Sequence, residues 1–437
     1  MASKRQVLRA LLPFALLTAG AAYAIASWNW CGRWEERAPV LRGQARAEGA
    51  LRAGAARVAL QPPFPVVVAG YPPSRPVASQ ADPPVHARAV VLQVGEVRVG
   101  LVSLELLTVT APLVEKLRSR AADLGLNDVL VFASHTHSSF GGYDARPVAE
   151  IAGTGRYRES SVEAAVSAAS DALHQASAAL ADVTLEVGQA REPGLVFSRS
   201  GGEGPDGALT RIVFRGALAP VAELLLFAAH PTLIPRDRAA VDPDYPGRLS
   251  TLREAQGGVV LVLQGPVGNA SVAFNEGQGE ERAAGFAQAL SKLADGAALT
   301  ATQGATRLSL ARAEVALPRP DASRLVPSLT RAAGDNFLCH SAARVAEVSA
   351  LSLGPLELLA LPGEPTMGAS QALLQRTGAT GVLGLSADYI GYVETPALVA
   401  KAEGESKRQY YGAKLLDRLG AAAELASQTA GFTAEPP

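Results

Sequence analysis

The chain has 437 residues, of which 48% are hydrophobic and 19% charged, so it can bury a large core and is not a mostly disordered protein. Its 40 basic and 41 acidic residues give a net charge of −1, and no Lys/Arg block indicates a nucleic-acid partner. Two cysteines are too few for a disulfide-rich scaffold or a cysteine-based zinc finger.

The N-terminus, residues 1–28, predicts a membrane segment. Lys4, Arg5 and Arg9 precede an uncharged run over residues 10–28, which is about long enough to cross a bilayer core. The basic flank should stay in the cytoplasm, which would place the rest of the chain outside it, in the periplasm or the extracellular space.

Two fates of this segment are open. Two A-x-A sequences in residues 22–26 would permit cleavage by a signal peptidase and secretion. We favour a retained anchor, because Trp28, Trp30 and Trp34 follow the run and tryptophan favours the headgroup layer of a bilayer.

Residues 29–50 are rich in Arg, Glu and Ala without a strand pattern, and we predict a linker or a short helix there. Cys31 and Cys339 could pair in an oxidising compartment, but we expect two unrelated cysteines. From residue 51 to 437 no Ser- or Pro-rich stretch divides the chain and no internal repeat is visible, so we expect a single large domain.

Short β-rich runs alternate with Ala/Leu-rich helical stretches through this domain. The alternation predicts an α/β body with mixed sheets flanked by helices. A hairpin is expected from residues 89–94 and 97–104, which flank Gly95-Glu96. Five continuous apolar runs are typical of strands covered on both faces: residues 129–133, 221–229, 259–263, 356–361 and 381–385.

Polar residues follow each of the five apolar runs. Ligand sites in open α/β sheets form outside the carboxyl ends of strands, so these residues are candidates for one site. In chain order they are His135 and His137, His230, the segment 264–271, Glu364, and the segment 388–392.

Imidazole and carboxylate are the usual zinc donors in proteins. His135 and His137 alone are a weak signal, because two loop histidines can equally be hydrogen-bonded residues. His230 and Glu364, each after another predicted strand, strengthen the case for a catalytic zinc with an open position for water.

Eight segments, taken together and in order, carry a resemblance to a known family. They are residues 69–71, 86–92, 134–143, 198–200, 227–232, 264–271, 361–366 and 389–396. The most specific is Ser-His-Thr-His-Ser at 134–138, which resembles a signature of the neutral/alkaline (non-lysosomal) ceramidase family. The resemblance covers roughly residues 54–418 and the N-terminal catalytic domain of that family only, without its β-sandwich domain.

This resemblance implies one zinc ion and a set of catalytic residues. The zinc ligands carried over from the family are His135, His230, Glu364 and Tyr392. His137 would move a proton between water and the leaving amine, and Arg199 would stabilise an oxyanion or hold a polar head group. Ser271 corresponds to a serine that is proposed as the nucleophile in some members. An equally good interpretation is a loop hydroxyl that orients the substrate.

The chain departs from the family at three places. Ser139-Phe140 replaces Gly-Pro, which should reshape the mouth of the site. Asn269 stands where the family has an aspartate, and Ala402 stands where it has a tyrosine. These changes leave the zinc ligands intact and weaken the assignment of ceramide as substrate.

The sequence therefore predicts a membrane-tethered, outward-facing zinc amidohydrolase acting on linear amides. A metal-activated water would cleave the N-acyl amide bond of ceramide or a related lipid. Two alternatives remain open: another metallo-amidase or esterase chemistry on the same site, and a non-catalytic protein that binds a lipid or an envelope partner. The sequence does not define the oligomeric state.

Overall fold

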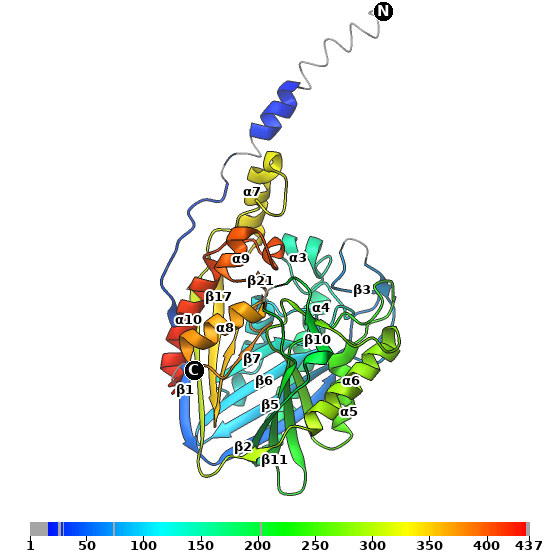
Figure 1. Cartoon of the computed structure of the whole chain (residues 1–437), viewed down its shortest axis with the longest axis vertical. Helices are drawn as coiled ribbons and strands as arrows, with labels where there is room; N and C mark the ends of the chain where they lie inside the picture. Colours follow the sequence, from blue (N-terminus) through cyan, green and yellow to red (C-terminus); the bar gives the residue numbers. More distant parts are fainter. Residues whose placement is uncertain (1–15, 25–27, 29, 73–74, 202, 434–437) are drawn as a thin grey trace, which may run out of the picture.

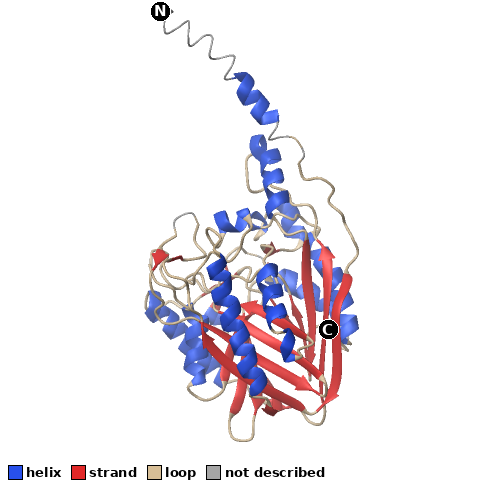
Figure 2. Ribbon diagram, turned by 180° about the vertical axis from the view of Figure 1, so that it is seen from behind, coloured by secondary structure: helices blue, strands red, loops and turns tan. Residues whose placement is uncertain are grey.

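Three five-stranded sheets form the body of the protein in a computed structural model. The structure describes residues 16–24, 28, 30–72, 75–201 and 203–433. Figure 2 shows the strands as one red body with blue helices packed against it.

The three sheets take their strands from successive parts of the chain. The first has the order β7-β6-β5-β2-β8, with β2 at Leu51–Ala59, β5 at His86–Val94, β6 at Val97–Leu104, β7 at Asp128–Ala133 and β8 at Ala181–Asp182. The second has the order β13-β12-β11-β9-β15, with β9 at Thr184–Arg191, β11 at Ala208–Arg215, β12 at Pro220–Phe227, β13 at Val259–Gln264 and β15 at Thr300–Ala301. The third has the order β1-β16-β17-β18-β20, with β1 at Val40–Gly49, β16 at Thr306–Ala316, β17 at Val345–Leu353, β18 at Leu356–Ala360 and β20 at Gly381–Leu383.

Short ladders and helices complete the fold. The two-stranded ladders join β3 (Val66–Val67) to β4 (Val77–Ala78), β10 (Val196–Ser198) to β14 (Ala270–Val272), and β19 (Glu364–Pro365) to β21 (Tyr392–Val393). The helices are α2 (Ala111–Arg120), α3 (Pro147–Ala152), α4 (Glu159–Ala178), α5 (Asp244–Glu254), α6 (Gly279–Asp295), α7 (Arg331–Ser341), α8 (Met367–Thr377), α9 (Pro396–Lys401) and α10 (Leu415–Ala430), and residues 16–24 are also helical.

All three sheets share one topology, although no sequence repeat is visible. In each, three successive strands pair antiparallel, a helix crosses over, and the next strand pairs parallel at the edge. The crossover helices are α2, α5 and α8. The opposite edge is filled by β8 and β15 in the first two sheets and by the N-terminal β1 in the third. The body therefore consists of three structurally equivalent units.

Successive side chains of each strand point to opposite faces of its sheet, so every sheet has two faces to bury. One face of all three sheets packs into a common core, represented by Leu92, Leu224 and Leu358. The other faces are covered by helices: α2 and α4 on the first sheet, α5 and α6 on the second, α8 and α10 on the third. Both faces are buried, which explains why the five predicted strands read as continuous apolar runs.

Most of the predicted elements are confirmed, and the linker is a partial exception. The hairpin and the five apolar strands lie where the sequence predicts them, as β5–β6 and as β7, β12, β13, β18 and β20. Residues 40–49, predicted as part of a linker, form β1 instead and pair with β16. The repeated topology was not predicted, because no repeat of residues accompanies it.

The N-terminal region brings a second correction. Cys31 and Cys339 form a disulfide with a Cα–Cα distance of 5.4 Å, where we expected two unrelated cysteines. Trp34 donates its indole N–H to the Leu317 carbonyl at 2.7 Å and stacks under Arg344, so it packs on the body rather than at a headgroup layer.

Much of the predicted membrane segment lies outside the described residues. In the parts of the chain that the structure does describe, no helix has both the length and the apolar character that a membrane crossing needs.

Candidate active site

A cavity of about 800 Å³ opens beyond the carboxyl ends of the strands. Its walls come from all three units, which meet here. The lining includes Gly70, Tyr71, His135, His137, Asp144, Arg146, Arg199, His230, Arg236, Leu325, Glu364, Tyr389, Tyr392, Lys407, Arg408 and Tyr410. The structure thus brings six of the seven site residues predicted from the sequence to one cavity.

His135 and His137 lie directly after β7. His135 has φ of 70°, a left-handed conformation that a side chain with a Cβ seldom adopts. Its Nδ1 faces the Leu107 carbonyl at 2.8 Å, and the Nδ1 of His137 faces the Gly70 carbonyl at 3.2 Å. A Cβ at Gly70 would come within 2.9 Å of His137, so glycine is required for this close approach.

His230 follows β12 in the second unit. Its backbone N–H and its Nδ1 both contact the Ala270 carbonyl, each at 3.0 Å. A backbone carbonyl at Nδ1 fixes the proton on that nitrogen in all three histidines. The Nε2 lone pairs of His135, His137 and His230 are therefore directed into the cavity, where the three nitrogens lie within 4.8 Å of one another.

Glu364 and Tyr392 are paired neighbours in the parallel ladder of β19 and β21. The ladder depends on Gly363, because a Cβ there would lie 2.2 Å from the Gly391 carbonyl oxygen. The Tyr389 hydroxyl donates a hydrogen bond to Oε1 of Glu364 at 2.7 Å. The other carboxylate oxygen, Oε2, lies 3.0 Å from Nε2 of His230 and 3.3 Å from Nε2 of His135.

The spacing of these donors fits a tetrahedral cation. Zinc bonds of about 2.0–2.1 Å place neighbouring ligand atoms about 3.3 Å apart. The Tyr392 hydroxyl lies 3.3 Å from Nε2 of His230, which matches the two contacts of the Glu364 carboxylate. Nε2 of His135, Nε2 of His137 and Oε2 of Glu364 are buried without a hydrogen-bond partner among the described residues. Lone pairs that face one another with no proton between them are stabilised by a metal ion.

Burial controls the protonation of these groups. It lowers the pKa of His137 well below its usual value, and the charges of His135 and His230 act in the same direction. It also lowers the pKa of His230, against the attraction of Glu364. Burial opposes ionisation of Glu364, yet His135 and His230 outweigh it and hold the pKa of the carboxyl well below its usual range. The pKa shifts favour neutral imidazole at His137 and His230 and an ionised carboxylate at Glu364, the forms in which these groups bind metals.

Arg199 is attached to the Tyr392 side of the site. Its guanidinium donates to the Tyr392 hydroxyl and to the Gly268 carbonyl, both at 2.8 Å, and to Glu405 at 2.9 Å. Burial raises the pKa of Tyr392 well above its usual value, the Glu364 charge adds to this, and Arg199 opposes it. Arg199 thus holds a fixed positive charge beside the phenol.

Ser271 is the predicted site residue that lies apart. It sits on β14, where it pairs with Phe197 of β10, and it is not among the described residues that line the cavity. Its neighbour Ala270 is the residue that contacts His230.

The three departures from the family pattern have structural explanations. Phe140 is fully buried and contacts Tyr143 edge to face, so the prediction that it reshapes the mouth is wrong. Asn269 donates to the Glu203 carbonyl and accepts from the Met367 N–H, a combination that an ionised aspartate could not provide. Ala402 ends α9 with φ of 56°, and Tyr410 supplies a phenol to the cavity wall instead.

Gln264 begins the candidate segment 264–271, and the sequence assigned it no role of its own. Its side chain donates to the Ser134 carbonyl at 3.1 Å and to the Tyr245 hydroxyl at 2.9 Å, and it accepts from the Ala229 N–H at 3.4 Å. Ser134 and Ala229 immediately precede His135 and His230 in the chain. One buried amide therefore forms hydrogen bonds to both segments that carry these histidines. The sequence signal for this role was the position of Gln264 at the end of β13.

The fold and the site together define an α/β protein with a buried cluster of metal-ligand type at its strand ends. No protein-family model matches the chain, and no curated protein matches its sequence. Two solved structures share the fold at 19% sequence identity. The neutral ceramidase from Pseudomonas aeruginosa superposes with a TM-score of 0.74, over 88% of this chain and 76% of that chain. A ceramidase complexed with C2 superposes with a TM-score of 0.72, over 89% and 77%. The resemblance predicted from the sequence motifs is confirmed at the level of the fold.

Proposed function

We propose that the chain is a zinc-dependent amidohydrolase of the neutral ceramidase type, which cleaves the N-acyl amide bond of ceramide or a related lipid. One observation carries the proposal: buried imidazole nitrogens and a carboxylate oxygen from three units converge at the spacing of ligands around a tetrahedral cation. The likeness of the fold to solved ceramidases supports the choice of substrate class.

His135, His230, Glu364 and Tyr392 are the proposed ligands, because their donor atoms have the ligand spacing described above. A zinc ion at this place supplies Lewis acidity, which polarises a carbonyl group and lowers the pKa of water towards neutrality. His137 belongs to the same histidine cluster, but the contacts at ligand spacing join Glu364 to His135 and His230, which leaves His137 for proton transfer.

The proposed roles of the other residues follow from their surroundings. Neutral His137 accepts a proton from the attacking water and returns it to the leaving amine. Arg199, with its charge fixed next to the Tyr392 hydroxyl, stabilises the negative charge that develops on the carbonyl oxygen. The position of Ser271 on β14 favours water as the nucleophile.

We further propose that the domain lies outside the cytoplasm, tethered by the apolar segment of residues 10–28. The disulfide between Cys31 and Cys339 supports this location, because disulfides persist in oxidising compartments. The basic residues ahead of the segment support the same orientation.

Zinc per protein and hydrolysis of an N-acylsphingosine, measured on the full chain, test the proposal. We expect about one zinc per wild-type chain, no zinc and no hydrolysis in His230→Ala, and wild-type values in His174→Ala. His174 is the matched control, since it is exposed on α4, away from the cavity. Full activity in zinc-free wild-type protein would contradict the metal mechanism. Zinc binding without hydrolysis would leave a metal site whose substrate is not an N-acylsphingosine.

A further inference from the structure

One end of the molecule exposes large apolar side chains around the cavity. Leu329 is 71% exposed, Ile151 63% and Leu325 43%. Ile151 belongs to α3, which contributes Val148, Ala149 and Ala152 to the cavity wall, and Leu325 lines the cavity itself. These side chains, together with Phe337 of α7, form what we call the apolar rim.

The predicted membrane segment leaves the body at the apolar rim. The Cys31–Cys339 disulfide fastens the chain to α7, and Asn336 of α7 bonds the Trp28 carbonyl and the Trp30 N–H. Figure 1 shows α7 at the end of the body that lies next to the helical residues 16–24. Trp28 and Trp30 are 69% and 54% exposed there.

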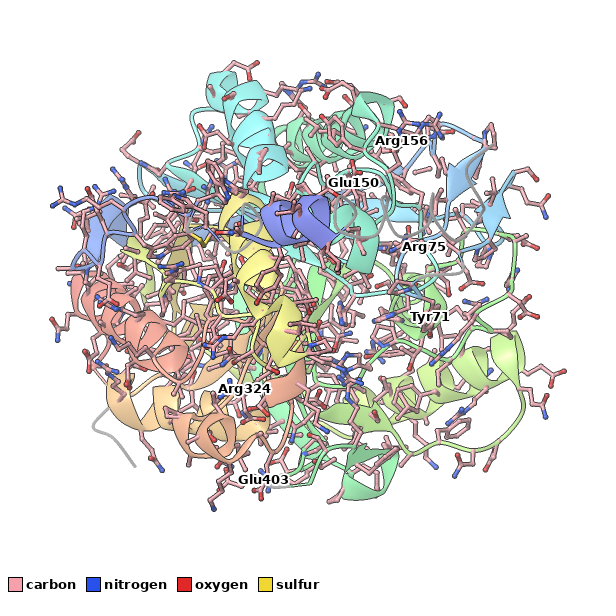
Figure 3. The ribbon with its side chains drawn as sticks, turned by 90° about the horizontal axis from the view of Figure 1, so that it is seen from above. Tyr71, Arg75, Glu150, Arg156, Arg324 and Glu403 are labelled. Carbon is pink, nitrogen blue, oxygen red and sulfur yellow. A yellow bond between two sulfur atoms is a disulfide. The ribbon has the colours of Figure 1, made fainter. Side chains whose placement is uncertain are left out.

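Cations surround the apolar rim. Arg236 and Lys407 line the cavity, and Arg75 and Arg156 lie on the same end of the molecule, as Figure 3 shows in the view onto it. None of these four side chains forms an ion pair with another described residue. Glu150 and Glu403 also lie on this end (Figure 3), but neither is paired with these cations among the described residues. Each free cation near an anionic bilayer contributes about 1 kcal/mol to its binding.

We infer that the apolar rim is a membrane-docking surface, which seats the mouth of the cavity on a bilayer containing anionic lipid. Exposed leucine, isoleucine and tryptophan enter the headgroup layer, and the unpaired arginines and lysine bind the lipid phosphates. The disulfide fixes the exit point of the membrane segment on α7, so the cavity faces the bilayer rather than turning freely on a tether. This inference rests on the proposed membrane tether and goes beyond the proposed catalysis, which it does not require.

A fluorescent probe on the rim tests the docking directly. The full chain carries an environment-sensitive dye on an introduced cysteine, Leu329→Cys, and is mixed with phosphatidylcholine vesicles containing phosphatidylglycerol. We expect the emission of the dye to shift to the blue and to rise several-fold. The matched control is Leu218→Cys, because Leu218 is 102% exposed on the turn between β11 and β12, at the opposite end of the body (Figure 1). The dye on Leu218→Cys should keep the emission of an aqueous environment with and without vesicles.

Several outcomes decide the inference. Equal, water-like emission at both positions in membrane-bound protein would overturn it, as would a shift at Leu329→Cys that needs an added envelope protein. Removal of phosphatidylglycerol should reduce the shift, and an unchanged shift would refute the role of the cations. The dye measurement needs no substrate. A blue shift at Leu329→Cys in a protein that does not hydrolyse N-acylsphingosine would therefore support the docking inference and contradict the proposed function.

Discussion

The first and third units each bury a glutamate near the end of the equivalent hairpin strand, and the two carboxylates have opposite surroundings. Glu105 directly follows β6 and binds the guanidinium of Arg88 and the His86 N–H. Arg88 is itself also paired with Glu254. Glu364 follows β18, and its Oε2 has no hydrogen-bond partner among the described residues.

The difference shows that burial alone does not mark a functional carboxylate. Arg88 and His86 outweigh the effect of burial on Glu105 and lower the pKa of its carboxyl, so this charge is neutralised permanently by the chain. The corresponding charge of Glu364 faces the imidazoles of His135 and His230 instead of a guanidinium, and imidazoles can share a carboxylate with an exchangeable cation. The first carboxylate stabilises the fold, and the second is held ready for a ligand.

The largest effect is expected for substitution of Glu364, and it distinguishes this glutamate from Glu105. Glu364→Gln should abolish both zinc binding and hydrolysis, because a neutral amide oxygen replaces the one anionic carboxylate donor. The free energy of unfolding of the metal-free protein should fall by less than in Glu105→Gln, since Glu364 contacts two imidazoles rather than a buried guanidinium. Zinc analysis, an activity assay and urea unfolding of the metal-free protein measure the three quantities. Retention of stoichiometric zinc would show that Glu364 is not a ligand.

Glu105→Gln is the matched variant and should behave in the opposite way. Breaking a buried ion pair costs roughly 3–5 kcal/mol, and we expect a loss near the lower end because Glu254 still neutralises Arg88. Urea unfolding should show this loss, while the folded fraction keeps its zinc. Loss of zinc at unchanged stability would reverse the assignment of the two carboxylates.

His137→Ala should lower the rate by about 10²–10⁴-fold, the usual contribution of a general acid–base group, and should leave zinc bound. Burial depresses the pKa of His137, so the base stays unprotonated as the pH falls through about 6.5, the ordinary histidine value. The acid limb of kcat/KM in the wild type should therefore lie below pH 6.5. A pH–rate profile measures this, and an acid limb that survived in His137→Ala would assign it to another group.

The smallest effect is expected at Gln264. Gln264→Leu keeps the approximate volume but loses the bonds to the segments that carry His135 and His230, so zinc affinity should fall by about 10–100-fold, as for other groups that orient metal ligands. Chelator competition measures the affinity. Gln189→Leu, on the exposed side of β9, is the control, and equal affinities in the two variants would remove Gln264 from the site.

The sequence predicts this site well because each donor follows a strand whose two faces are both buried. His135, His230 and Glu364 could be placed together from that rule alone, since carboxyl ends of strands meet at one edge. The three-unit arrangement could not be predicted, because it is a repeat of topology without a repeat of residues. Gln264 was also missed as a support, since its role depends on two loops distant in the sequence.

The errors near the N-terminus have a common cause, which is pairing over a long sequence separation. Cys31 and Cys339 are 308 residues apart, and nothing local indicates their contact. Residues 44–48 alternate small and polar side chains, Gln-Ala-Arg-Ala-Glu, with the alanines packed on the core. This is a period-2 signal, but the lack of β-branched residues concealed it.

During synthesis, β1 is made long before the strand with which it pairs. Val40 pairs with Glu314, so the first strand to leave the ribosome waits for about 270 further residues. At roughly 5–20 residues per second this takes about 14–54 seconds, during which β1 lacks the strand with which it forms its ladder. Charged and small residues protect such an unpaired edge from aggregation. The composition that makes β1 resemble a linker thus suits a strand that must stay soluble until the last unit of the body is complete.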